Sequence, residues 1–174
     1  MPTTTTLVAG PSGDMSEIIP GRLWIGTAQA ANDKDFLTKH SITHIINCTQ
    51  VPSSLLDEED DCYLQLNLRD EPVSPTNFTT PKTPLTTDLL DRTSAFIHNV
   101  IDNNNGAVLI HCQFGVSRSV AIAAAYFLSQ HSDWSPRQAQ SWIAPKRSAA
   151  AVNIWFQRNF ADYRHYLARK EVDE

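Results

Sequence analysis

Two hydrophobic patterns alternate along the chain. Short apolar or alternating runs bounded by turn residues predict strands, whereas longer amphipathic runs predict helices. The expected strands cover residues 21–26, 42–48, 62–68 and 107–110. The expected helices cover residues 33–40, 88–103, 118–130, 135–142 and 153–168. Because strands and helices alternate, we expect a single α/β domain with helices flanking a central, twisted, mainly parallel sheet.

The ends of the chain differ in composition from its centre. Residues 1–17 are rich in threonine and poor in large apolar side chains, which indicates a flexible N-terminal arm. We expect the folded domain to span residues 18–169, followed by a short tail at 170–174. A chain of 174 residues, 41% of them hydrophobic, is large enough to bury one core.

Charge and cysteine content restrict the partners and the compartment. A net charge of −5 disfavours binding to the phosphate backbone of nucleic acid. Three cysteines are too few for a disulfide framework, which favours a reducing compartment. The first residues lack the basic and apolar regions of a signal peptide, and no apolar run reaches the length of a membrane span. We therefore expect a cytoplasmic or nuclear protein with no membrane partner.

The stretch "AVLIHCQFGVSRSVAIAAAYFL" at 107–128 carries the candidate chemistry. A strand ends near Cys112, and a tight loop leads to a helix that starts at Arg118. Such a loop directs backbone N–H groups into one concavity at a helix N-terminus, where an anion binds. Arg118 adds a charged fork that matches two oxygens of a phosphoryl group. The predicted phosphate-binding residues are the loop and this arginine: Gln113, Phe114, Gly115, Val116, Ser117 and Arg118.

Cys112 lies at the base of this predicted loop. A thiol beside a helix N-terminus and a guanidinium has a lowered pKa, so Cys112 is expected to be a thiolate near neutral pH. A thiolate beneath a phosphoryl group is placed for attack on phosphorus. We expect His111 to orient the loop and the Ser119 hydroxyl to stabilise the thiolate when it leaves.

"HCQFGVSRS" (residues 111–119) resembles the signature His-Cys-x-x-Gly-x-x-Arg-Ser of the protein tyrosine phosphatases, in the form typical of small dual-specificity phosphatases. Residues 23–50 resemble the opening strand, helix and second strand of that family. "KRSAAAVNIWFQRNF" (residues 146–160) resembles its closing segment, and the match assigns supporting roles to Arg147 and Asn153.

The resemblance implies an enzyme that dephosphorylates phosphotyrosine, phosphoserine and phosphothreonine in proteins through a cysteinyl-phosphate. It implies a phosphorylated protein as partner and no cofactor. It also places the general acid directly after the strand at 62–68, which falls on Asp70, with Glu71 as the second choice. The oligomeric state stays open.

Several alternatives accompany this interpretation. The loop carries no lysine, which favours phosphoprotein over inositol phosphates, but a phosphoinositide phosphatase and a catalytically weak phosphate-binding module stay open. Phe114 stands where the family more often has alanine, and it either shapes the pocket wall or packs. Arg147 and Arg158 are candidates for holding a second phosphate or an acidic flank of the substrate.

Cysteine and histidine positions elsewhere suggest two further possibilities. In parts of the family the catalytic cysteine forms a reversible disulfide, for which Cys48 or Cys62 would be the partner. His40, His44 and Cys48 have a spacing that would form a metal site on a helix, but residues 42–48 are predicted as a strand, so we expect no metal.

Overall fold

A five-stranded sheet forms the centre of the protein, seen in a computed structural model that describes residues 14–52, 61–69 and 85–173. The strand order is β1-β2-β5-β3-β4. β1 pairs antiparallel with β2, and the other three pairings are parallel. The strands are β1 (Met15–Ile19), β2 (Leu23–Thr27), β3 (His44–Asn47), β4 (Tyr63–Gln65) and β5 (Val108–Cys112).

The central strand β5 is buried along its whole length, as expected for an apolar run covered on both faces of a parallel sheet. In its registers, Thr27 of β2 lies opposite Cys112, and Asn47 of β3 lies opposite His111. The carboxyl ends of three parallel strands therefore meet at one edge, where α/β folds commonly bind ligands.

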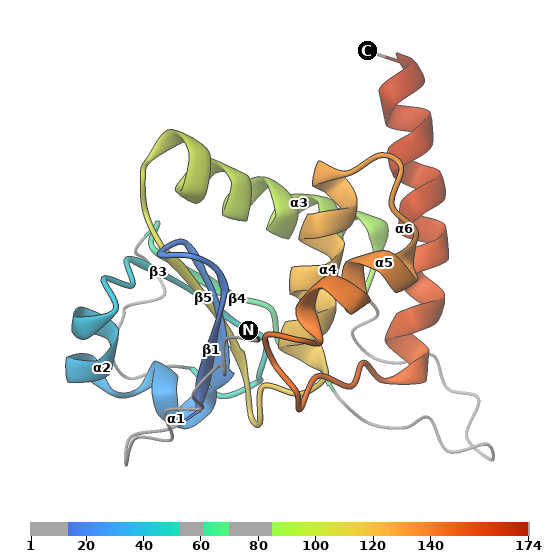
Figure 1. Cartoon of the computed structure of the whole chain (residues 1–174). Helices are drawn as coiled ribbons and strands as arrows, with labels where there is room; N and C mark the ends of the chain where they lie inside the picture. The colour runs from blue at the N-terminus through green and yellow to red at the C-terminus, as the bar shows by residue number, and fades with distance from the viewer. Residues whose placement is uncertain (1–13, 53–60, 70–84, 174) are drawn as a thin grey trace, which may run out of the picture.

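Helices cover both faces of the sheet (Figure 1). The short helices α1 and α2 lie on one face, and the longer helices α3 to α6 lie on the other. Alanines and β-branched residues make α4 almost entirely buried, so it forms the centre of the larger core. The helices are α1 (Ala28–Ala31), α2 (Lys34–Lys39), α3 (Thr87–His98), α4 (Arg118–Gln130), α5 (Pro136–Ile143) and α6 (Ile154–Asp173), and a π-helical turn, η1 (Asn99–Asn103), continues α3.

The expected α/β architecture is confirmed, and most predicted elements are found within a few residues of their predicted bounds. β5 ends two residues later than predicted, on Cys112 itself. α5 begins as expected, with Ser135 as N-cap in a capping box and Pro136 in the first turn. Among the described residues, no helix is long and apolar enough to cross a membrane.

The predictions for both ends of the domain need correction. Residues 15–17 were expected to belong to a flexible arm, but they lie in β1, where Ser16 and Ile18 face the interior. The alternation of only five residues was too short to stand out from the threonine-rich segment before it. The predicted tail at 170–174 is also wrong through residue 173, because α6 extends to Asp173.

Candidate active site

The loop of residues 113–117 connects the end of β5 to the start of α4 at the carboxyl edge of the sheet (Figure 1). Cys112 ends the strand with 2% of its surface exposed, and Arg118 begins the helix. Ser117 is the N-cap of α4, but its side chain makes no capping hydrogen bond. The Ser117 side chain therefore does not cap the first N–H groups of α4. A helix N-terminus with uncapped N–H groups can bind an anion.

Donors outside the loop bind the carbonyl oxygens of all five loop residues. The side chain of Arg147 donates to Gly115 O from Nε (2.5 Å) and to Phe114 O from Nη2 (3.2 Å). Since each peptide group is planar, a carbonyl held outward turns the N–H of the same peptide inward. Backbone N–H groups bind the other three carbonyls: Ala28 donates to Gln113, Ala151 to Val116 and Ala121 to Ser117.

The sulfur of Cys112 receives the inward-facing donors. The N–H of Gly115 donates to Sγ at 3.2 Å, and the Ser119 hydroxyl lies 3.3 Å from Sγ. Burial alone would raise the pKa of the Cys112 thiol. Hydrogen bonds from the Ser119 hydroxyl and from the backbone N–H groups of Ser119 and Val116, together with the charge of Arg118, outweigh burial and lower this pKa below its usual value.

Gly115 adopts a left-handed backbone with φ of 63°. A Cβ on this residue would lie 2.5 Å from Nη2 of Arg147 and 2.7 Å from the carbonyl oxygen of Gly26. Both the conformation and the close approach of β2 therefore require glycine at this position.

Arg118 is half-buried at the start of α4. Its Nη1 donates to the carbonyl oxygen of Leu68 at 3.1 Å. Leu68 belongs to the segment that follows β4, two residues before Asp70 in the sequence. Arg118 thus connects the loop at 113–117 to the segment that precedes the predicted general acid, Asp70, in the sequence.

His111 is buried in β5, and burial lowers its pKa to about 4. Its imidazole is therefore neutral at physiological pH. Its backbone carbonyl accepts the N–H of Cys48, so the residue is held in the sheet. The role of its ring in orienting the loop stays a prediction.

Arg147 and Asn153 both contact the loop from outside. Arg147 is 2% exposed, with Nη1 donating to Ser16 Oγ (3.0 Å) and Nη2 paired with Asp14 Oδ2 (3.1 Å). The idea that Arg147 holds a second phosphate is wrong, because its guanidinium is buried behind the loop. The N–H of Asn153 donates to Ser117 Oγ at 3.0 Å, which attaches the start of α6 to the loop.

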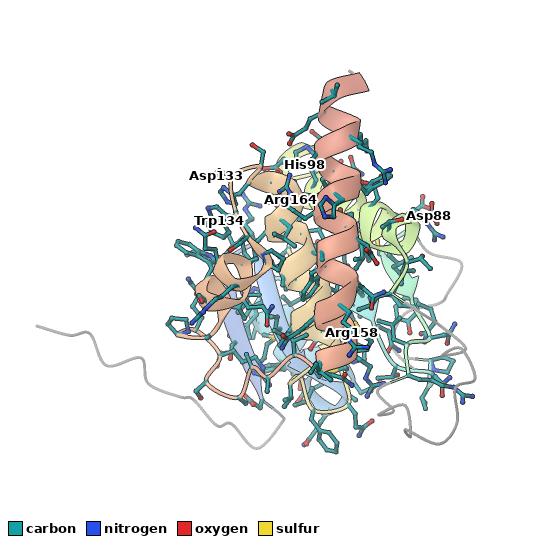
Figure 2. The ribbon with its side chains drawn as sticks, turned by 90° about the vertical axis from the view of Figure 1, so that its right-hand side faces the viewer. Asp88, His98, Asp133, Trp134, Arg158 and Arg164 are labelled. Carbon is teal, nitrogen blue, oxygen red and sulfur yellow. The ribbon has the colours of Figure 1, made fainter. Side chains whose placement is uncertain are left out.

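Three further candidate side chains are exposed to solvent. The side chain of Phe114 is 72% exposed, so it does not pack into the interior, and Gln113 is also exposed. Arg158 lies exposed on α6 (Figure 2). The predicted acids Asp70 and Glu71 lie outside the described residues.

All three cysteines are free thiols. Cys48 is fully buried, and burial raises its pKa well above the usual value. The disulfide suggested by the family resemblance therefore stays a prediction. No group of three metal-binding side chains was found in the described ranges.

Asp14 and Ser16 were not predicted as residues of the site. Both lie in the segment assigned to the arm, and they contact Arg147 more than 130 positions away. A polar residue facing inward in a short alternating run would have been the only local signal.

The loop between a parallel strand and a buried helix, with donors directed at the Cys112 sulfur, agrees with the phosphatase class that the sequence resemblance implies. Residues 23–166 match the family described as "Dual specificity phosphatase, catalytic domain". The chain therefore belongs to this family, and the predicted class of activity, a dual-specificity protein phosphatase, is confirmed.

Relatives and solved structures agree with this membership. The chain is 32% identical to dual specificity protein phosphatase 18 of Homo sapiens over 86% of this chain and 73% of that protein. It is 29% identical to dual specificity protein phosphatase 14 of Homo sapiens over 92% of this chain and 75% of that protein. The crystal structure of DUSP15 superposes with a TM-score of 0.72 at 28% identity, covering 92% of this chain and 96% of that one.

A third kind of neighbour is similar in fold. The human tyrosine phosphatase-like serine/threonine/tyrosine-interacting protein superposes with a TM-score of 0.68 at 27% identity, over 87% of this chain and 96% of that one. The name of that protein describes it as phosphatase-like and interacting.

Proposed function

We propose that this protein hydrolyses phosphotyrosine, phosphoserine and phosphothreonine in proteins through a cysteinyl-phosphate on Cys112. The observation that carries the proposal is the lowered pKa of a thiol surrounded by the loop N–H groups and the Ser119 hydroxyl. A thiolate in this setting is a nucleophile at neutral pH, and the donors around it suit the oxygens of a phosphoryl group.

In the first step the Cys112 sulfur attacks phosphorus. The S–P bond forms while the bond from phosphorus to the substrate oxygen breaks, and that oxygen leaves with a proton from Asp70. Arg118 and the loop N–H groups bind the non-bridging oxygens, whose charge they neutralise during the transfer. In this role Arg118 would give up its bond to Leu68 O or share it with phosphate.

In the second step water attacks phosphorus and the S–P bond breaks. Asp70, now a carboxylate, takes the proton of the water, and inorganic phosphate leaves. The electron pair returns to sulfur, where the Ser119 hydroxyl at 3.3 Å donates to the departing thiolate. Sulfur is a better leaving group when its thiolate is stabilised, so Ser119 acts mainly here.

The substrate class follows from the rim of the loop. Gln113, Phe114, Val116 and Ser117 carry no charge, so the loop adds only Arg118 to the attraction of phosphate. A single phosphoryl group on a protein side chain suits this charge better than a polyanionic inositol phosphate does. The partner is then a phosphorylated protein, and three free thiols favour a reducing compartment such as the cytoplasm or nucleus.

One competing function has its own observation. The likeness to a protein described as phosphatase-like and interacting favours, as the second candidate, a module that binds a partner. A cysteine with a lowered pKa and an arginine at the loop favour catalysis instead, because a module that only binds phosphate needs no ionised nucleophile.

Hydrolysis of a small aryl phosphate tests the proposal, with the parent protein compared with Cys112→Ser and Asp70→Asn. We expect turnover by the parent, none above background for Cys112→Ser, and a loss of about a hundredfold for Asp70→Asn. Turnover that survives Cys112→Ser would exclude the mechanism. An inactive parent that still binds phosphopeptide would support the binding module. Phosphate release from phosphopeptides and inositol lipids, measured in parallel, decides the substrate class.

A further inference from the structure

Arg147 follows α5 and lies behind the loop, on the side opposite the Cys112 sulfur. It is a buried arginine whose every hydrogen-bonding nitrogen has an assigned acceptor: Gly115 O for Nε, Ser16 Oγ for Nη1, and Phe114 O together with Asp14 Oδ2 for Nη2. A buried guanidinium is tolerated only when it is paired and hydrogen-bonded in this way. The plane of the guanidinium is therefore fixed by the loop carbonyls on one side and by Ser16 and Asp14 on the other.

The two carbonyls that Arg147 holds belong to peptide groups that also face the sulfur. The peptide between Phe114 and Gly115 presents its C=O to Nη2 of Arg147 and its N–H to Sγ of Cys112. The next peptide, between Gly115 and Val116, presents its C=O to Nε of Arg147, and its N–H is one of the donors around Cys112. Arg147 and the sulfur thus lie at opposite ends of the same two planar groups.

We propose that Arg147 is a positioning residue that favours the thiolate form of Cys112 by fixing the orientation of these two peptide groups. The proposal rests on the function proposed above, in which Cys112 acts as a thiolate. Because Arg147 lies behind the loop, it contacts neither the sulfur nor a phosphate bound above it. Its effect passes through the peptides, which it both orients and polarises, since hydrogen bonds in a chain strengthen one another at low dielectric.

An arginine is needed because a single planar guanidinium must donate hydrogen bonds to two carbonyls and two further acceptors. A lysine in its place would carry the charge but could not hold both carbonyls in a fixed plane. Ser16 of β1 and Asp14, directly before that strand, also bind Arg147 and stop the guanidinium from rotating away from the loop. β1 thus contributes to the site although none of its residues reaches the sulfur.

The test is the rate at which iodoacetamide alkylates Cys112, followed by peptide mass spectrometry as a function of pH. Alkylation reports the thiolate directly and needs no catalytic activity. For Arg147→Met we expect the rate at about pH 6 to fall about tenfold and the midpoint of the pH profile to rise, because one aligned donor to the thiolate is lost. For Arg147→Lys, which is the second variant should the first not fold, we expect a change of the same sign and smaller size.

Arg164→Met is the matched control. Arg164 lies higher on α6 than Arg158 (Figure 2), and its Nη1 donates to the carbonyls of Leu128 (3.0 Å) and His131 (3.1 Å) at the far end of α4. This variant also removes an arginine that holds two carbonyls, so it should lower the thermal stability without moving the alkylation profile.

The outcomes separate this inference from the proposed function. A parent profile with a low midpoint that is unchanged in folded Arg147→Met or Arg147→Lys would overturn the role of Arg147 and leave the proposed function intact. A midpoint that rises equally in Arg164→Met would overturn it as well. A parent whose Cys112 has the ordinary pKa of a thiol would overturn the proposed function itself, and the positioning role with it.

Discussion

Replacing Gly115 with alanine tests how closely the loop must approach its surroundings. The residue has φ of 63°, where a Cβ costs about 1–2 kcal/mol through contact with its own backbone. The added Cβ would also lie 2.7 Å from the carbonyl oxygen of Gly26, which belongs to the backbone of β2 and cannot rotate away. Overpacking of this kind adds about 1–3 kcal/mol. We therefore expect Gly115→Ala to lower the free energy of unfolding by about 3 kcal/mol.

Gly21→Ala separates the two contributions. Gly21 has nearly the same backbone, with φ of 67°, but a Cβ there would meet nothing within 4 Å. It should therefore show the conformational cost alone, about 1–2 kcal/mol, and should keep full phosphatase activity. The excess loss in Gly115→Ala measures the contact with β2 and Arg147.

Urea unfolding of both variants gives the stabilities, and turnover of an aryl phosphate gives the activities. Because a loop displaced by a fraction of an ångström misplaces several donors, we expect Gly115→Ala to lose about a hundredfold in kcat/KM. The reasoning is refuted if Gly115→Ala is no less stable than Gly21→Ala and retains the parent's turnover.

Two further predictions concern Ser119, which contacts the Cys112 sulfur, and His111, which precedes Cys112 in the chain. Ser119→Ala removes the hydroxyl 3.3 Å from the sulfur, so it should raise the pKa of the thiol. It should also slow the release of phosphate from the cysteinyl-phosphate about tenfold, so that this intermediate accumulates. Single-turnover kinetics in which the cysteinyl-phosphate does not accumulate would contradict this prediction. His111 has a pKa of about 4 in the fold against 6.5 when unfolded, so its contribution to stability is complete above pH 6.5 and is lost as the pH falls toward 4. Between about pH 7 and pH 5 the parent should lose about 2 kcal/mol more than His111→Gln in urea unfolding, and equal losses would contradict the burial argument.

The strand, loop and helix around Cys112 could be predicted because every signal for them is local. An apolar run, a glycine and an arginine at a helix start all lie within residues 107–118, and α4 begins at Arg118 as expected. The role of Ser119 followed from the same stretch, and its contact with the sulfur is found in the structure.

The support behind the loop could not be predicted for the opposite reason. Arg147 reached the list of candidates only through the family resemblance, and its burial and acceptors depend on residues brought together by the sheet. β1 is five residues long and, among the described strands, pairs with β2 alone, so its formation depends on tertiary pairing more than on its own sequence.

The most direct test of the account is to trap the covalent intermediate. A phosphorylated substrate is mixed rapidly with the enzyme, the reaction is quenched in acid, and the peptide that contains Cys112 is examined by mass spectrometry. The account predicts that this peptide gains one phosphoryl group on sulfur, in an amount that Ser119→Ala increases. Turnover in which Cys112 never carries phosphate, or in which another residue carries it, would contradict the central claim that this sulfur is the nucleophile.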